Sequence, residues 1–321
     1  MKKLLTIILI LAALAISGCT ENQDKPEMSI EELKALTLSA ADNLTSYSLQ
    51  STMSRIRTIN AIGANATAEN ATTIKESAET SAIVSLADQQ AHAKGSTTIE
   101  AERPGLDKNT TTTEAEIYQM GNSTYILDDS GNWTHLQDPR TAEEIWREGN
   151  NNQVKAMAET FNLSQVEMMG SERVDGIDAY KLRIITGESD NEALYNTAFS
   201  LAANLVSYPM LVPDINREEL NETGKIEKTI WISKSTYLPV KYHSMMSFTM
   251  TPSIVGGMDI NTSQITMFNE SIKMGAVDVT IEASDIYYDI NKPLDINPPA
   301  EALDAIVIRP VQIEANSSSQ Q

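Results

Sequence analysis

Cysteine and histidine are nearly absent from this sequence. One cysteine and three histidines occur in 321 residues, which excludes a disulfide within the chain. His92, His135 and His243 are isolated, so the spacing of a metal site is missing. There is also no G-x-S-x-G, no phosphate-binding glycine-rich loop and no H-E-x-x-H. The sequence therefore predicts no catalytic residue, no metal ligand and no cofactor.

Basic residues are scarce relative to acidic ones. The chain has 24 Lys and Arg against 44 Asp and Glu, which gives a net charge of −20. Such a charge repels nucleic acid and anionic head groups, so neither is an expected partner. The acidic residues are spread along the chain, which favours a solvated acidic surface over a dedicated cation site.

Only one stretch is strongly apolar, and it lies at the N-terminus. Leu4 to Ile16 follows two lysines and precedes Ser17-Gly18-Cys19, the pattern of a secretory signal peptide. The run is shorter than the ~20 residues of a transmembrane helix. A signal that ends just before cysteine resembles the lipobox of prokaryotic lipoproteins. The resemblance implies removal of residues 1–18 and a lipid on the Cys19 sulfur, anchoring the protein to the extracytoplasmic face of the membrane; the alternative is an ordinary signal with an incidental thiol.

Sequons for N-glycosylation are frequent. The eleven N-x-S/T acceptors are Asn43, Asn65, Asn70, Asn109, Asn122, Asn132, Asn162, Asn221, Asn261, Asn269 and Asn316. Together with the lipobox and the acidic composition, they indicate an exported glycoprotein and point to an archaeal cell surface. The alternative is that Asn, Ser and Thr simply gather in polar loops.

The mature chain is expected to form one domain. The sequence predicts that residues 19–28 form a lipidated tether, that residues 29–308 form a single folded domain, and that residues 309–321 form a flexible tail. Capping boxes begin at Ser29, Thr141 and Ser189. They predict helices over 29–45, from 141 to about 161 with a break at 149–152, and from 189 to before Pro209.

Between the helices the hydrophobic period is two. Strands are expected at residues 47–53, 76–102, 110–120, 125–127, 133–136, 166–174, 177–185, 226–232, 237–250, 260–268 and 277–288. Successive strands with one apolar and one polar face predict a curved antiparallel sheet, whose apolar face the helices must cover. The fold class is therefore α+β.

Three segments resemble the LolA/LolB type of lipoprotein-sorting carriers, a likeness shared by lipid-carrying mycobacterial surface lipoproteins. They are Val174–Leu182, Trp231–Lys241 and Tyr287–Pro293, which follow a capped N-terminal helix and a long meander. The resemblance implies an incomplete β-barrel of about eleven strands with helices plugging its concave face. It also implies a hydrophobic cavity between sheet and plug. Soluble carriers of this type have no lipid of their own, so an anchored chain is more like a receptor or a resident surface protein.

Alternation along the strands gives a hypothetical cavity lining. It consists of Leu201, Leu205, Val206, Val240, Tyr242, Met246, Phe248, Met250, Val279 and Ile281. Methionines are numerous in the later strands, and flexible thioethers suit either an acyl-chain cavity or ordinary core filling.

Three functions remain open. The first is a non-catalytic surface lipoprotein that binds a lipid or another hydrophobic ligand. The second is a glycosylated structural or adhesion component of the cell envelope, with envelope proteins as partners and no cavity. The third, an extracytoplasmic hydrolase, needs convergent polar groups that the sequence does not show.

Overall fold

The computed structural model describes residues 28–61, 71–128, 130–148, 151–205, 214–251, 255–256 and 274–308. None of the helices within these ranges is long and apolar enough to cross a bilayer. The predicted signal peptide, most of the tether, the strand expected at 260–268 and the predicted tail lie outside the described residues.

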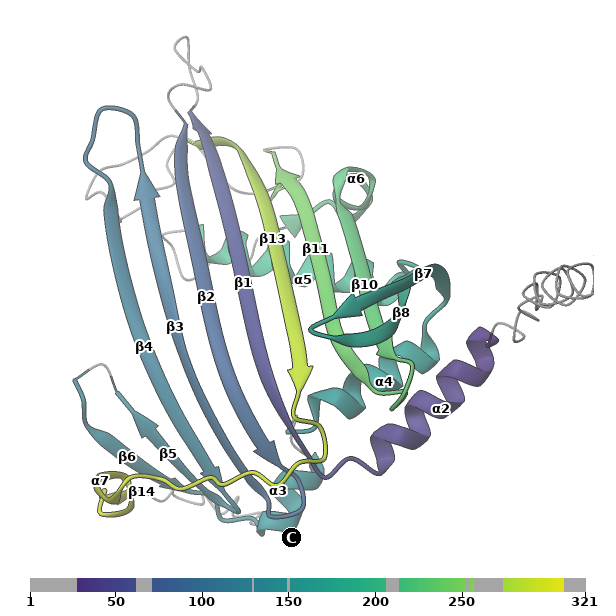
Figure 1. Cartoon of the computed structure of the whole chain (residues 1–321). Helices are drawn as coiled ribbons and strands as arrows, with labels where there is room; N and C mark the ends of the chain where they lie inside the picture. Colours follow the sequence, from purple (N-terminus) through teal and green to yellow (C-terminus); the bar gives the residue numbers. More distant parts are fainter. Residues whose placement is uncertain are drawn as a thin grey trace, which may run out of the picture.

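A twelve-stranded sheet forms most of the described protein (Figure 1). Its order is β14-β6-β5-β4-β3-β2-β1-β13-β11-β10-β8-β7, which has two ends and is therefore an open, incomplete barrel. All pairs are antiparallel except β14 with β6. The strands are β1 (Ser46–Ala61), β2 (Thr72–Ser85), β3 (Gln90–Glu102), β4 (Asn109–Met120), β5 (Ser123–Leu127), β6 (Trp133–Gln137), β7 (Val166–Val174), β8 (Ile177–Ile184), β10 (Lys225–Ser233), β11 (Pro239–Met250), β13 (Met274–Tyr288) and β14 (Val307–Ile308). The predicted curved antiparallel sheet is confirmed.

The helices begin where polar side chains can cap them. In α2 (Ile30–Asp42) the Ser29 hydroxyl accepts a hydrogen bond from the Glu32 backbone N–H at 3.1 Å, as predicted. The helix predicted from Thr141 is two helices, α3 (Ala142–Glu148) and α4 (Gln153–Leu163). A capping box opens α3, because the Glu144 carboxylate accepts from the Thr141 N–H at 2.8 Å.

The third capping box differs from the prediction. Helix α5 (Glu188–Leu205) begins one residue before Ser189, so Ser189 lies inside the helix. The Asp190 carboxylate accepts a hydrogen bond from the Gly187 N–H at 3.0 Å and also contacts the Lys228 ammonium of β10. The start of α5 is thus fixed by a carboxylate that is tied to the sheet.

Helix α6 (Arg217–Thr223), with Asn216 as its N-cap, was not predicted. A two-stranded pair of β9 (Asp214–Ile215) and β12 (Val255–Gly256) lies apart from the main sheet's ladder. The single-turn α7 (Ala300–Leu303) follows β13 and a segment that crosses the near face of the sheet in Figure 1.

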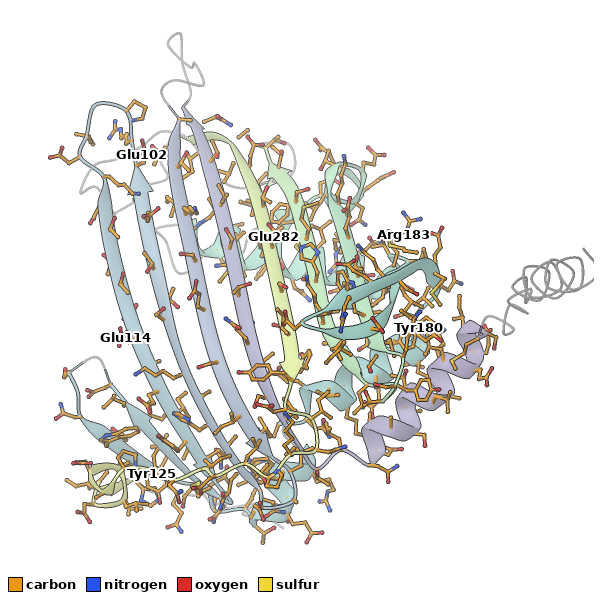
Figure 2. The ribbon with its side chains drawn as sticks, in the orientation of Figure 1. Glu102, Glu114, Tyr125, Tyr180, Arg183 and Glu282 are labelled. Atoms are coloured by element: carbon orange, nitrogen blue, oxygen red, sulfur yellow. The ribbon has the colours of Figure 1, made fainter. Side chains whose placement is uncertain are left out.

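The two faces of the sheet differ in what covers them. Helices α4 and α5 lie behind the strands in Figure 1, on the concave face, as predicted. The opposite, convex face is largely polar: Figure 2 shows Glu114 on β4 and Glu282 on β13 from this side. Part of it is covered, where Ile296 and Ala302 pack against Tyr118 and Tyr125.

Two regions of the concave face are packed by helices. The α5 cluster consists of Ile59, Ile74, Ala101, Leu194, Ala198, Leu201, Ala202, Ile215, Leu220, Phe248, Met250, Val277 and Val279. The α4 clusters consist of Ala41, Leu44, Tyr47, Leu49, Val84, Val154, Ala158, Leu238 and Tyr287, and of Leu33, Phe161, Leu182, Ile184, Ile230 and Ile232. Burial of these side chains holds the helices on the sheet.

Candidate functional site

Between the α5 cluster and the α4 clusters, the concave face is lined mostly by small side chains. Thr113, Thr97, Ala78, Met53, Ala283 and Ser244 are successive cross-strand partners from β4 to β11. Thr113 is exposed and the other five are half-buried. We call this part of the face the concave trough. All of these side chains except Met53 are small, so they cover little of the backbone beneath them.

The trough deepens over β3 and β4. A hollow of about 290 Å³ is lined by Thr80, Ala93, Gly95, Ser96, Thr97, Thr113, Glu114, Ala115 and Ile117. Gly95 is needed at its floor, because a Cβ there would come within 2.8 Å of Thr80 Oγ1 and 2.9 Å of the Glu79 carbonyl oxygen. The volume is near the lower end for small-molecule sites, about 300 Å³.

The structure brings six of the ten predicted cavity residues together, but in a packed core. Leu201, Phe248, Met250 and Val279 are at most 6 % exposed, and Met246 and Ile281 pack against them. Helix α5 therefore lies directly on the sheet at this end, and the hollow that the structure shows is beside the cluster rather than under the helix.

The remaining predicted cavity residues are elsewhere. Tyr242 packs with the Phe161 and Ile230 cluster. Val240 lies at a register shift, where Trp231 pairs with Lys241 but Ile232 pairs with Pro239. The extra residue breaks the alternation, so Val240 packs with Trp231 instead of joining the α5 cluster. Leu205 ends α5 without a described side chain, and Val206 lies outside the described residues.

A half-buried acid lies at the edge of the trough toward α4. Asp285 of β13 is the cross-strand partner of Ser51 and of Tyr242. Burial raises the pKa of the Asp285 carboxyl, and a hydrogen bond from Ser51 opposes part of that rise. Burial, assisted by Asp190 and Asp285, also raises the pKa of Tyr242 to about 12. Asp285 and Tyr242 therefore lie in poorly hydrated surroundings at the edge of the trough toward α4.

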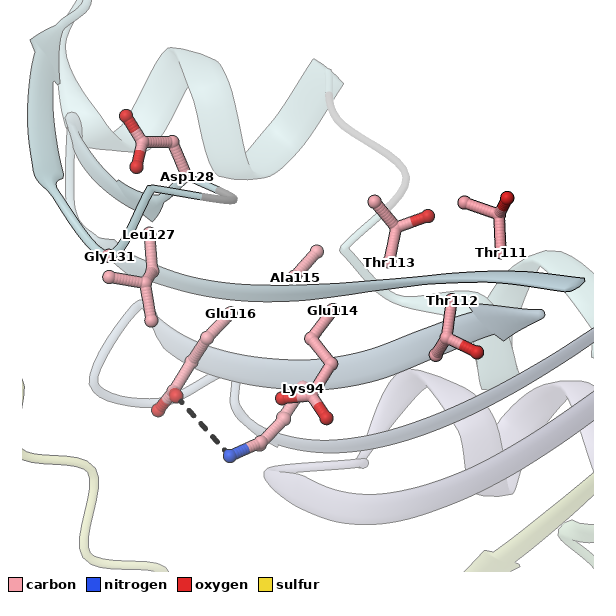
Figure 3. A pocket seen from close by; sticks show the side chains of 10 residues that line it. All are labelled: Lys94, Thr111, Thr112, Thr113, Glu114, Ala115, Glu116, Leu127, Asp128 and Gly131. Atoms are coloured by element: carbon pink, nitrogen blue, oxygen red, sulfur yellow. Dashed lines mark ion pairs between the residues drawn. The ribbon is translucent and has the colours of Figure 1, made fainter.

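A second hollow, of about 700 Å³, lies at the free edge of β4 (Figure 3). Its lining is Lys94, Thr111, Thr112, Thr113, Glu114, Ala115, Glu116, Leu127, Asp128 and Gly131. Burial alone would raise the pKa of the Glu116 carboxyl, but hydrogen bonds from His92 and Tyr118 outweigh it and lower the pKa. Lys94 pairs with the same carboxylate at 3.8 Å. This polar, acidic edge does not suit a hydrocarbon chain.

The predicted modification sites are only partly within the described residues. Asn43, Asn109, Asn132, Asn162 and Asn221 are exposed on the described surface. Asn122 is half-buried, and its amide donates to the Asp138 carbonyl oxygen at 3.1 Å. The other five sequons and Cys19 lie outside the described residues.

No group of three or more His, Cys, Asp or Glu side chains that could hold a metal ion occurs in the described part of the chain. Asp128 belongs to a turn, because its Oδ1 accepts from the Ser130 and Asn132 N–H groups.

Comparison with known proteins gives distant structural likenesses. No protein-family model and no curated protein sequence matches the chain. LprF from Mycobacterium bovis aligns over 85 % of this chain and 98 % of its own, with 13 % identity and a TM-score of 0.39. The lipoprotein LppX from Mycobacterium tuberculosis aligns over 84 % and 98 %, with 11 % identity and a TM-score of 0.31.

A putative outer membrane lipoprotein-sorting protein domain from Vibrio parahaemolyticus aligns over 84 % of this chain and 95 % of its own, with 11 % identity and a TM-score of 0.22. The names of two of these three proteins mention a lipoprotein or lipoprotein sorting. Similarity at this level transfers neither a ligand nor an activity to the chain, and the archaeal source stays a prediction.

Proposed function

We propose that the protein is a membrane-anchored, extracytoplasmic lipoprotein that binds a lipid or another hydrophobic ligand in the concave trough and has no catalytic activity. One observation carries the proposal. The helices pack both ends of the concave face, yet small and half-buried side chains are left between them. An apolar chain laid across Met53, Ala78 and Ala283 would remove their remaining apolar surface from water, which is favourable at ~25 cal/mol per Å².

The shape of the trough suits an extended ligand. It crosses six strands, β4 to β11, and opens at the β3–β4 side, where the 290 Å³ hollow lies. A flexible acyl chain can follow such a surface, whereas a compact polar substrate would leave it empty.

A lipid anchor on Cys19 is compatible with ligand binding in the concave trough. Cys19 precedes the first described residue, Met28, by a segment that spans at most about 30 Å when fully extended. A lipid on Cys19 would keep the trough close to the membrane from which a hydrophobic ligand could come.

A glycosylated structural component of the envelope is the second candidate. It is favoured by the solid packing of the α5 cluster and by the exposed Asn109 sequon at the start of β4. It predicts stable association with envelope proteins and no uptake of apolar probes.

Uptake of a fluorescent fatty acid distinguishes the two candidates. Ala78→Phe places a ring in the trough, whereas Ser77→Phe places the same ring on the convex face of the same strand. We expect Ala78→Phe to weaken binding about tenfold or more and Ser77→Phe to leave it nearly unchanged. No uptake by the wild-type protein, or equal loss in both variants, would contradict the proposal.

A further inference from the structure

Two arginines lie side by side on the concave face of β1, where apolar or small side chains prevail. Arg55 is the cross-strand partner of Ile281 in β13 and of Glu76 in β2. Arg57 is the partner of Val279 and of Ile74. Ile74 and Val279 belong to the α5 cluster and Ile281 packs against it, so the guanidinium groups lie at the border between that cluster and the trough.

The two positive charges share one carboxylate. Arg55 Nη1 lies 3.1 Å and Arg57 Nη2 lies 3.9 Å from the same oxygen of Glu76, Oε2. The side chains are mostly buried, at 31 % exposed for Arg55, 19 % for Arg57 and 17 % for Glu76. Two cations therefore face one anion in a region where water is partly excluded.

The hydrogen-bonding capacity of this pair is not filled. Within the described residues, the Nε atoms of Arg55 and Arg57 are buried without a hydrogen-bond partner. Burial lowers the pKa of Arg57, Glu76 opposes that effect, and Arg55 adds to it. Asp285, the acid on the neighbouring strand, is four residues from Ile281, or about 13 Å along β13. It is too distant to supply the missing acceptor.

We propose that Arg55 and Arg57 bind the anionic head group of an amphiphile, a carboxylate or a phosphate, while its hydrocarbon part lies in the concave trough. This inference rests on the proposed function. Guanidinium groups bind such oxyanions through paired, charge-assisted hydrogen bonds, which are stronger where water is excluded. Met53 and Ala78, the next residues of β1 and β2 on this face, continue the surface from the arginines into the trough.

Glu76 competes with the head group for the guanidinium groups of Arg55 and Arg57. In the unliganded protein it holds both guanidinium groups, and an incoming anion competes with it for them. The site therefore favours anionic over neutral amphiphiles although the chain as a whole carries a charge of −20. Removing the charge of Glu76 should strengthen the binding of an anion and leave a neutral ligand unaffected.

A pair of probes with one hydrocarbon chain tests the inference: cis-parinaric acid and its methyl ester, titrated by fluorescence. We expect Arg57→Met to weaken binding of the acid about tenfold and to leave binding of the ester unchanged. Arg57→Lys keeps the charge and should recover part of the affinity for the acid, and Glu76→Gln should bind the acid more tightly than the wild type.

Arg183→Met is the matched control. Arg183 lies on β8 and pairs with Glu167 of β7, away from the trough (Figure 2). Arg183→Met removes the same charge as Arg57→Met, so a general effect of net charge would appear in both variants. Circular dichroism establishes that each variant is folded, and Arg57→Lys and Glu76→Gln keep the test decisive if Arg57→Met does not fold.

The outcomes separate this inference from the proposed function. One outcome is that the acid and the ester bind equally well, with no Arg57 or Glu76 variant changing the ratio of their affinities. That result would contradict the head-group site but leave the proposed binding of a hydrophobic ligand intact. If neither probe binds the wild type, the proposed function itself fails. Acetate and inorganic phosphate serve as competitors that lack a long hydrocarbon chain. If either displaces cis-parinaric acid at a concentration equal to that of the probe, the site is a simple anion site and the inference is overturned.

Discussion

The covered strands β8, β10, β11 and β13 differ sharply from the open strands β4 and β5 and the middle of β3, whose end at Ala101 belongs to the α5 cluster. On the covered strands, concave-face residues such as Ile230, Phe248 and Val279 are at most 3 % exposed. On β4, Ile117 of the same face is 38 % exposed, and residues 109–115 are all exposed. The alternation of side chains is similar in both parts, so burial depends on whether a helix lies across the strand. Side-chain size follows the same division, because β4 begins Asn-Thr-Thr-Thr-Thr whereas β11 ends in Met-Met-Ser-Phe-Thr-Met.

Deleting one large side chain from each part gives the largest contrast. Phe248→Ala leaves a cavity beneath α5 and should lower the free energy of unfolding by about 3–5 kcal/mol. Ile117→Ala removes a side chain that is already partly in water and should cost under about 1 kcal/mol. Urea denaturation measures both. Equal losses would show that the open strands have a cover beyond the described residues.

An added methyl group tests whether the open part is also tightly packed. Gly95→Ala would bring its Cβ against Thr80 Oγ1 and the Glu79 carbonyl oxygen, at 2.8 and 2.9 Å. We expect a loss of about 1–3 kcal/mol in the free energy of unfolding. Ser96→Ala, the next residue on the opposite face, is the control and should change it by less than about 0.5 kcal/mol. A neutral Gly95→Ala would mean that β2 and β3 separate easily at this point.

The smallest expected effect is a pH dependence within the covered part. Because the pKa of Asp285 is raised in the folded protein, the folded state binds its proton more tightly than the unfolded state. The associated stability is fully present below the unfolded pKa and is lost as the pH rises through the folded pKa. Asp285→Asn removes this titration.

The gain in stability from Asp285→Asn over the wild type should therefore grow from about pH 3 to about pH 7. Chemical denaturation across this range measures the difference. Glu282→Gln, on the convex face of the same strand, serves as the control. A difference that stays constant with pH would show that the Asp285 carboxyl is as well solvated as an exposed one.

Local signals in the sequence predicted most of the elements. Ser29 and Thr141 cap helices because their hydroxyl groups accept from backbone N–H groups three residues later, an interaction that four residues contain in full. Alternation along a strand is also contained within a short segment, so it predicted the strands of the sheet. Helix α6 was not predicted because its seven residues are too few to show a period of 3.6. Its start does carry helix signals, namely Asn216 and an acidic first turn.

Features that depend on partners far along the chain could not be predicted. The face of Val240 is set by a register shift against β10, and the hydrophobic pattern of β11 alone does not reveal it. The same holds for the solid packing of Leu201 against Phe248, which depends on how closely α5 approaches the sheet. The sequence therefore predicted which side chains are apolar and share a face, but not where space remains.

The sequence contains a signal for the position of the arginine pair. A strand with a period of two was expected at residues 47–53, and continuing its alternation places Arg55 and Arg57 on the same face as Met53. Two charged residues on an otherwise apolar face are a signal worth pursuing. Their shared partner Glu76 is 21 residues from Arg55 and becomes apparent only once β1 and β2 are paired.

The position of β13 has a consequence for how the chain is made. Strands β1 to β6 form one contiguous block of the sheet and β7, β8, β10 and β11 form another, and β13 is the strand that joins them. Residues 274–288 follow both blocks in the sequence, so the two blocks cannot be joined before β13 has been synthesised. Such long-range closure slows folding.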